Sequence, residues 1–204
     1  MKIKVDFKII LAIIIFYITE QLELYFILML FVFLHECGHL LVGYLFGYRC
    51  EEINIHTLGI SVTFKVPVDD YNKKILKSNI VLLKKSIIAA AGPVINFILI
   101  ILVSLNPKIF AMNPEIAIYS NLLIGCFNMI PIYPLDGGRI LKNICTIFLG
   151  IRKGRRLTSI IMNTLMIVLT AVSSIMILYY KNIAIFLIVV YLWYLVIREE
   201  NKKF

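Results

Sequence analysis

The feature that most constrains this chain is a series of long apolar runs that contain few charged residues. An α-helix needs about 20 such residues to cross the hydrocarbon core of a bilayer. Several runs reach or approach that length, and the segments between them are polar. The pattern predicts six transmembrane spans, at Ile9–Thr19, Tyr25–Phe46, Ser86–Leu105, Ile116–Met129, Ile160–Tyr179 and Ile183–Ile197.

The composition supports a membrane environment. Of the 204 residues, 61% are hydrophobic and 16% are charged, whereas a soluble domain has about 45–50% apolar and about 25% charged residues. A soluble domain of this length has too little interior to bury the excess, so lipid is the natural place for it. The four cysteines are scattered and form no CxxC pair, which indicates a reducing compartment rather than a disulfide framework.

The distribution of positive charge predicts the orientation. If the N-terminus is cytoplasmic, all of the 21 lysines and arginines except Lys108 and Lys181 fall on the cytoplasmic side of the six spans. An asymmetry of this kind is typical of membrane proteins. It explains the net charge of +9 without a nucleic-acid partner, and it places both termini in the cytoplasm.

The largest segment outside the spans lies between the second and third of them. Residues 53–57 and 60–66 alternate between apolar and polar side chains, Gly59 lies between these runs, and Pro67 ends the second. This pattern predicts a short β-hairpin. Asp69–Lys85 is polar and is expected to be surface. The predicted fold is an all-α membrane protein of about six transmembrane helices with this hairpin, in a single domain over residues 1–204.

The second span contains a polar motif, His35-Glu36-Cys37-Gly38-His39. Ionisable residues inside a span are costly and usually functional. On a helix, positions i and i+4 share a face, so His35 and His39 can offer nitrogens to one metal ion. Glu36 can then approach a water at the metal without being a ligand, and zinc suits this donor set. We therefore predict a zinc site with Glu36 as general acid and base. A buried polar cluster that only connects helices is the alternative.

Two nearby residues are given ordinary roles. His56 lies in the predicted hairpin and is expected to be a polar surface residue. Cys37 is expected to be a small inert residue on the helix.

A catalytic zinc needs a third protein ligand, and Asp136 is the strongest candidate. Glu115 begins the fourth span on the opposite side, and Glu199 and Glu200 lie in the basic C-terminal tail. Asp136 follows the fourth span where two prolines and two glycines interrupt the helix. An ordinary surface turn is the other interpretation. His39 lies seven residues before the cytoplasmic end of its span, which puts the site roughly 10–15 Å below that surface.

Three motifs together resemble the site-2 proteases, a family of intramembrane zinc metalloproteases. They are His35–His39 for the HExxH motif, Ala91–Asn96 for A-G-P-x-x-N, and Asn128–Gly137 for N-x-x-P-x-x-P-L-D-G. The resemblance implies that His35, His39 and Asp136 hold one zinc ion and that Glu36 is the acid and base. It also implies that Asn96 and Asn128 shape the site, although interhelical hydrogen bonding explains either asparagine equally well. A further implication is a β-strand that pairs with an unwound substrate, which the alternation at 53–66 fits.

The compact layout is most similar to the stage IV sporulation FB branch of that family. That similarity implies a multi-pass protein of the bacterial cell membrane whose substrate is a membrane-associated regulatory protein, such as a sigma-factor precursor in sporulation. It also allows for an inhibitory membrane partner. We expect no CBS domain after Phe204 and no PDZ domain.

Two other functions are compatible with a metal motif in a membrane. A metal-binding transporter would need ligands along a pathway, and this chain has only three histidines. A non-catalytic membrane scaffold would typically lack Glu36 or a ligand, and here all are present.

Overall fold

The structure is a computed structural model that describes residues 2–5, 7–56, 59–65, 75–110, 112–181 and 184–201. The chain divides into two compact units, Met1–Asn128 and Met129–Phe204. Each unit is described by itself, and the expectation of a single domain stays a prediction.

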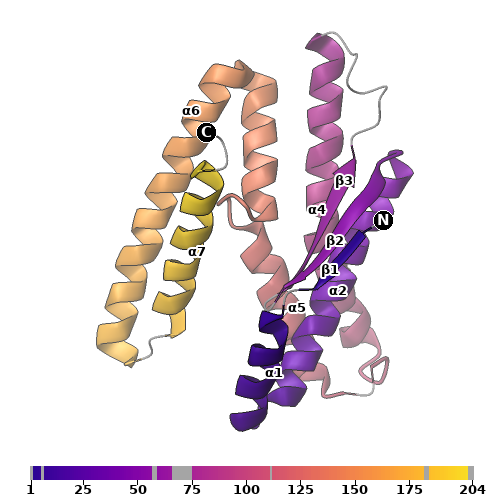
Figure 1. Ribbon diagram of the computed structural model, residues 1–204, viewed down its shortest axis with the longest axis vertical. Coiled ribbons are helices and arrows are strands. Elements are labelled where there is room, and N and C mark those ends of the chain that lie inside the picture. Colours follow the sequence, from indigo (N-terminus) through magenta and orange to yellow (C-terminus); the bar gives the residue numbers. More distant parts are fainter. Residues whose placement is uncertain are drawn as a thin grey trace. The chain divides into compact units, whose positions relative to one another are not determined.

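The first unit combines helices with a small sheet (Figure 1). Its helices are α1 (Lys8–Ile18), α2 (Leu22–Leu45), α4 (Ile75–Leu105) and α5 (Pro114–Met129). Buried side chains from α2, α4 and α5 form a common core around the fully buried Phe31. The other buried members of this core are Ile27, Val103, Ala117 and Ile124.

The predicted hairpin is confirmed and has a third strand. β2 (Arg49–His56) pairs antiparallel with β3 (Gly59–Lys65), and β1 (Lys2–Val5) pairs parallel with β2. The strand order is therefore β1-β2-β3. β3 lies against α2, where Phe64 packs close to Gly43. The sequence analysis missed β1, because a four-residue strand cannot be distinguished by its pattern from the start of an apolar helix.

α2 and α4 pack closely at one crossing point. A Cβ atom on Gly38 would meet the Ile95 side chain at 2.7 Å and the Ala91 carbonyl oxygen at 2.8 Å. Only glycine therefore allows the two backbones to approach this closely. α4 also contains Pro93, two residues after Ala91, and a proline inside a helix disrupts the hydrogen bonding of the preceding turn.

The second unit consists of α6 (Asp136–Tyr180) and α7 (Ala184–Asn201). α6 is two helical segments joined at Gly150, whose φ of 76° and ψ of 169° are non-helical. Gly154 packs against the backbone of Cys145 and Thr146 on the other side of this turn. α7 runs beside the longer segment of α6 (Figure 1), where the Trp193 indole donates a hydrogen bond to Thr170 Oγ1 at 3.1 Å.

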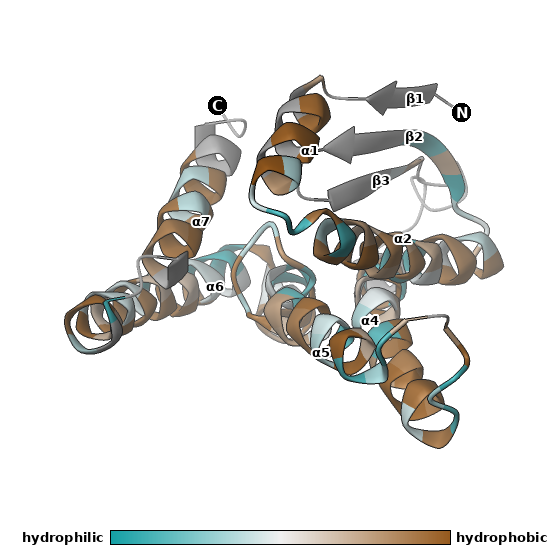
Figure 2. Ribbon diagram, turned by 90° about the horizontal axis from the view of Figure 1, so that it is seen from below, coloured by the Kyte–Doolittle hydropathy of each residue, from teal (hydrophilic) through white to brown (hydrophobic). Residues whose placement is uncertain are grey.

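Three helices of the described residues are long and apolar enough to cross a membrane, at Leu22–Leu45, Asn79–Leu105 and Asp136–Tyr179. Phe186–Ile197 is a shorter apolar helix. α1 and α5, with 11 and 16 residues, contain the predicted first and fourth spans but are short for a complete crossing. The count of six spans therefore stays a prediction, whereas the mostly helical, apolar architecture is confirmed (Figure 2).

Two helices extend beyond the predicted spans. α4 begins at Ile75, so the second half of the expected surface segment Asp69–Lys85 is helical; residues 66–74 and the expected stop at Pro67 lie outside the described part. The basic segment before Ile160 is also helical, because α6 already begins at Asp136. In both places the helix continues beyond the bilayer-length apolar run, and apolar content alone does not mark that extension.

Candidate metal centre

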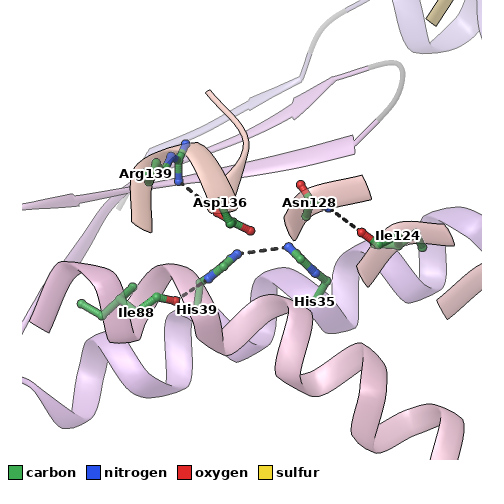
Figure 3. Close-up of polar contacts among 7 residues, drawn as sticks. All are labelled: His35, His39, Ile88, Ile124, Asn128, Asp136 and Arg139. Atoms are coloured by element: carbon green, nitrogen blue, oxygen red, sulfur yellow. Dashed lines mark hydrogen bonds and ion pairs between the residues drawn. The ribbon is translucent and has the colours of Figure 1, made fainter. Parts of the chain in front are cut away.

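His35 and His39 lie one helical turn apart on α2 and face the same point. Both are buried, with 3% and 5% of their surface exposed. Their Nε2 atoms are 3.1 Å apart, and the ring planes are nearly perpendicular, at 85°. The predicted placement of the two imidazoles on one face of a helix is confirmed (Figure 3).

The other nitrogen of each ring faces an oxygen atom. His35 Nδ1 lies 2.6 Å from Asn96 Oδ1, and His39 Nδ1 lies 2.7 Å from the carbonyl oxygen of Ile88. Since both oxygens are acceptors, each Nδ1 carries the proton and donates it. In the neutral tautomer, each Nε2 then presents a lone pair, which is the form that binds a metal.

The geometry of this pair fits a zinc ion. Two nitrogen ligands at 2.0–2.1 Å from a tetrahedral zinc are about 3.3 Å apart, close to the 3.1 Å between the two Nε2 atoms. Space is left beside them by Gly92 of α4, where a Cβ atom would lie less than 3.0 Å from both Nε2 atoms. The glycine of the Ala91–Asn96 motif therefore faces the place where a metal would bind.

Glu36 and Cys37 lie between the two histidines in sequence and are half-buried. Glu36 takes part in an interaction with another residue of the described chain. His56 belongs to β2, but its side chain lies outside the described part, so its expected surface role stays a prediction.

Asp136 belongs to the second unit, where it is the first residue of α6. It is buried, with 4% of its surface exposed, and its carboxylate lies 3.6 Å from the Arg139 guanidinium one turn later (Figure 3). A carboxylate in the first turn is stabilised by the helix dipole. His35 and His39 of the first unit and Asp136 of the second are thus three buried side chains, each of which can offer a ligand atom to a metal ion.

The segment before Asp136 packs tightly against the start of α6. A Cβ atom on Gly137 would collide with the backbone of Met129 and Ile130, and one on Gly138 with the backbone of Ile132 and Tyr133. The two glycines therefore let the chain fold back onto the first turn of α6. This is the helix break that the prolines and glycines predict, and the Tyr133–Pro134 peptide bond in it is cis.

The two asparagines that the sequence singles out differ in their contacts. Asn96 is fully buried and contacts His35 directly, as described above. The amide of Asn128 donates instead to the Ile124 carbonyl oxygen in its own helix, at 3.0 Å (Figure 3). A third asparagine, Asn121 of α5, was missed: it is fully buried and accepts a 2.9 Å hydrogen bond from Asn96. Its position in an apolar run was the signal that could have identified it.

These features define a helical membrane protein with a histidine-based metal centre. The model of peptidase family M50 matches residues 23–107 and 106–172, which cover most of the chain and include both halves of the predicted site. The chain therefore belongs to peptidase family M50.

The relatives of this chain include two curated proteins and a solved structure. It is 29% identical over 153 residues to the zinc metalloprotease MJ0392 of Methanocaldococcus jannaschii, covering 72% of this chain and 41% of that protein. It is 25% identical over 143 residues to stage IV sporulation protein FB of Bacillus subtilis, covering 69% and 46%. The chain thus spans less than half the length of each curated relative.

The solved structure is a site-2 protease from Methanocaldococcus jannaschii. It superposes with a TM-score of 0.68 at 24% identity, and the match covers 97% of this chain and 89% of that one. This similarity shows that the two chains share a fold.

Proposed function

We propose that this chain is an intramembrane zinc metalloendopeptidase of the site-2 protease type. In this proposal His35, His39 and Asp136 hold one zinc ion, and Glu36 is the general acid and base. The observation that carries the proposal is the histidine pair: two buried imidazoles whose Nε2 atoms meet at 3.1 Å, with Nδ1 of each directed at an acceptor oxygen. Membership of peptidase family M50 gives this pair its chemical context.

Apart from the activation of water, which zinc would supply, the steps of peptide hydrolysis are assigned to residues of the chain. When bound, zinc supplies the Lewis acidity that makes water nucleophilic near neutral pH. Glu36 takes a proton from the attacking water and passes it to the leaving amine. Asn96 and the Ile88 carbonyl keep the two imidazoles in the tautomer that binds a metal. Asn128 shapes the site from the end of α5.

A peptide substrate would bind as an added strand. The sheet has two edge strands, β1 and β3, and an extended peptide can form main-chain hydrogen bonds with such an edge. We propose that the substrate is a membrane-associated regulatory protein and, given the similarity to a stage IV sporulation protein FB, a sigma-factor precursor. An inhibitory membrane partner is part of the same proposal.

The metal site is tested by the zinc content of the purified protein. We expect one zinc per chain in the wild type and a sharply reduced content in Asp136→Ala and in the isosteric Asp136→Asn, because both remove a charged ligand. Ser174→Ala, at an exposed position of the same helix, is the control. Equal zinc in the wild type and both Asp136 variants would exclude Asp136 as a ligand.

The acid–base role is tested by Glu36→Gln in proteoliposomes that also contain a sigma-factor precursor from the same genome. We expect the variant to keep its zinc and to lose cleavage by a factor of about 10²–10⁴, the usual contribution of a positioned acid or base. Undiminished cleavage would contradict the proposed mechanism. Loss of zinc together with cleavage would instead assign Glu36 to the metal site itself.

A further inference from the structure

A chain of buried amides connects His35 to α5. His35 Nδ1 lies 2.6 Å from Asn96 Oδ1, Asn96 Nδ2 donates to Asn121 Oδ1 at 2.9 Å, and Asn121 Nδ2 donates to the Ala117 carbonyl oxygen at 2.8 Å. Neither asparagine has any exposed surface. The chain crosses three helices, α2, α4 and α5, all within the first unit.

The direction of each hydrogen bond follows from the last acceptor. A backbone carbonyl can only accept, so the end of Asn121 that faces Ala117 must be its NH2 group. The end that faces Asn96 is then an oxygen, and it requires the NH2 group of Asn96. The oxygen of Asn96 is thereby turned toward His35, whose Nδ1 must carry the proton. Without this constraint the amide of Asn96 could rotate by 180° and present a donor to His35.

We propose that Asn121 is a positioning residue for the metal centre: it holds the Asn96 amide in the one orientation that leaves His35 Nε2 available to a metal. The inference rests on the proposed zinc site and deepens it. Asn121 touches neither histidine in the hydrogen bonds described, and it acts only through Asn96.

A purely structural role for Asn121, as an interhelical hydrogen bond that holds α4 to α5, makes a different prediction. If Asn121 only holds α4 to α5, its loss weakens zinc binding whichever residue occupies position 96. If Asn121 acts by orienting the Asn96 amide, its loss has little effect on zinc binding once the residue at position 96 presents an acceptor oxygen to His35 in either orientation. Asn96→Asp provides this condition, because both carboxylate oxygens accept and a carboxylate beside a metal-ligating imidazole is a common arrangement. Its second oxygen would face the Asn121 oxygen with no proton between them, and Asn121→Leu removes that mismatch.

The experiment is a double-mutant cycle on the full chain in detergent. Its members are wild type, Asn121→Leu, Asn96→Asp and the double variant Asn96→Asp/Asn121→Leu. Asn121→Ala is measured in parallel, so that the size of the leucine side chain does not decide the result. Ser120→Ala is the matched control, since Ser120 is buried on the same helix but is not a member of the amide chain. The zinc dissociation constant is measured by competition with a chelator, and the visible spectrum of the Co²⁺-loaded protein reports the ligand geometry.

We expect Asn121→Leu and Asn121→Ala to weaken zinc binding by about 10–100-fold, the usual effect of losing an outer partner of a metal ligand. The double variant should bind zinc within a few-fold of Asn96→Asp and should restore the Co²⁺ spectrum, and Ser120→Ala should match the wild type. Binding by Asn121→Leu and Asn121→Ala equal to the wild type would overturn the inference. So would a double variant as weak as Asn121→Leu. Failure of the wild type to bind zinc would instead overturn the proposed function.

Discussion

At the scale of single residues, the metal centre depends as much on the absence of a side chain as on the ligands. A Cβ atom on Gly92 of α4 would lie less than 3.0 Å from both Nε2 atoms, in the space that a metal needs. The missing side chain of Gly92 therefore leaves room for the ion and also lets α4 approach α2. A substitution at this position therefore tests the site without changing a ligand.

We expect Gly92→Ala to bind little or no zinc while remaining helical, because alanine favours the helix but its methyl group collides with both imidazoles. Ser104→Ala is the control, because Ser104 is an exposed residue of the same helix. Zinc content by atomic absorption and helicity by circular dichroism decide the comparison. A Gly92→Ala protein with full zinc content would show that the ion does not bind beside the two Nε2 atoms.

The histidine pair could be predicted from the sequence because its spacing has a direct geometric meaning. Positions i and i+4 of a helix always share a face, so His35 and His39 had to lie together once α2 formed. Asn121 could not be identified in this way, because it acts through its hydrogen bond with Asn96, which lies on another helix and 25 positions away in sequence. Its neighbours in space depend on the register of α4 against α5, which no local pattern specifies.

At the scale of elements, hydropathy located the membrane helices but not their ends. α4 extends from the apolar run toward its N-terminus through lysines, and α6 includes the basic residues that lie between the predicted fourth and fifth spans. A helix can continue into water beyond its apolar run. An apolar composition therefore locates the part of a helix that lies in the bilayer, but not the ends of the helix. The turn at Gly150 was missed because its cause is a backbone angle and not a change in hydropathy.

The Gly150 turn gives an element-scale prediction. A Cβ atom at Gly150 would meet no atom within 4 Å, but the φ of 76° and ψ of 169° lie in a region that is essentially restricted to glycine. We expect Gly150→Ala to destabilise the second unit by about 1–3 kcal/mol through backbone strain alone. The measurement is the midpoint of thermal unfolding in detergent, with the exposed neighbour Arg152→Ala as the control. An unchanged midpoint would mean that α6 can straighten at no cost.

At the scale of the whole molecule, the surface itself indicates a membrane. Many large apolar side chains on the long apolar helices are more than half exposed, among them Phe33 on α2, Ile101 on α4 and Ile167 on α6. In water such surfaces would promote association, whereas lipid solvates them without cost. This is why a chain with a modest number of buried residues can be 61% hydrophobic.

The proposed orientation leads to a prediction about topology. A reporter that is active only in the cytoplasm should be active when fused after Phe204 and inactive when inserted after Lys108, because the basic segments are expected to stay on the cytoplasmic side. A reporter active only outside the cytoplasm should show the reverse pattern and serves as the control. Activity of the first reporter at both positions would contradict the proposed arrangement of spans.

The parallel pairing of β1 with β2 restricts how the chain can insert. β1 precedes α1 and β2 follows α2, yet the two strands are hydrogen-bonded neighbours with Lys2 opposite Glu52. If the sheet lies on one side of the bilayer, α1 and α2 together must make an even number of crossings. This conclusion does not depend on the distribution of charged residues. An insertion of α1 and α2 as one hairpin would satisfy it, and β1 could then pair with β2 only after the second helix had returned.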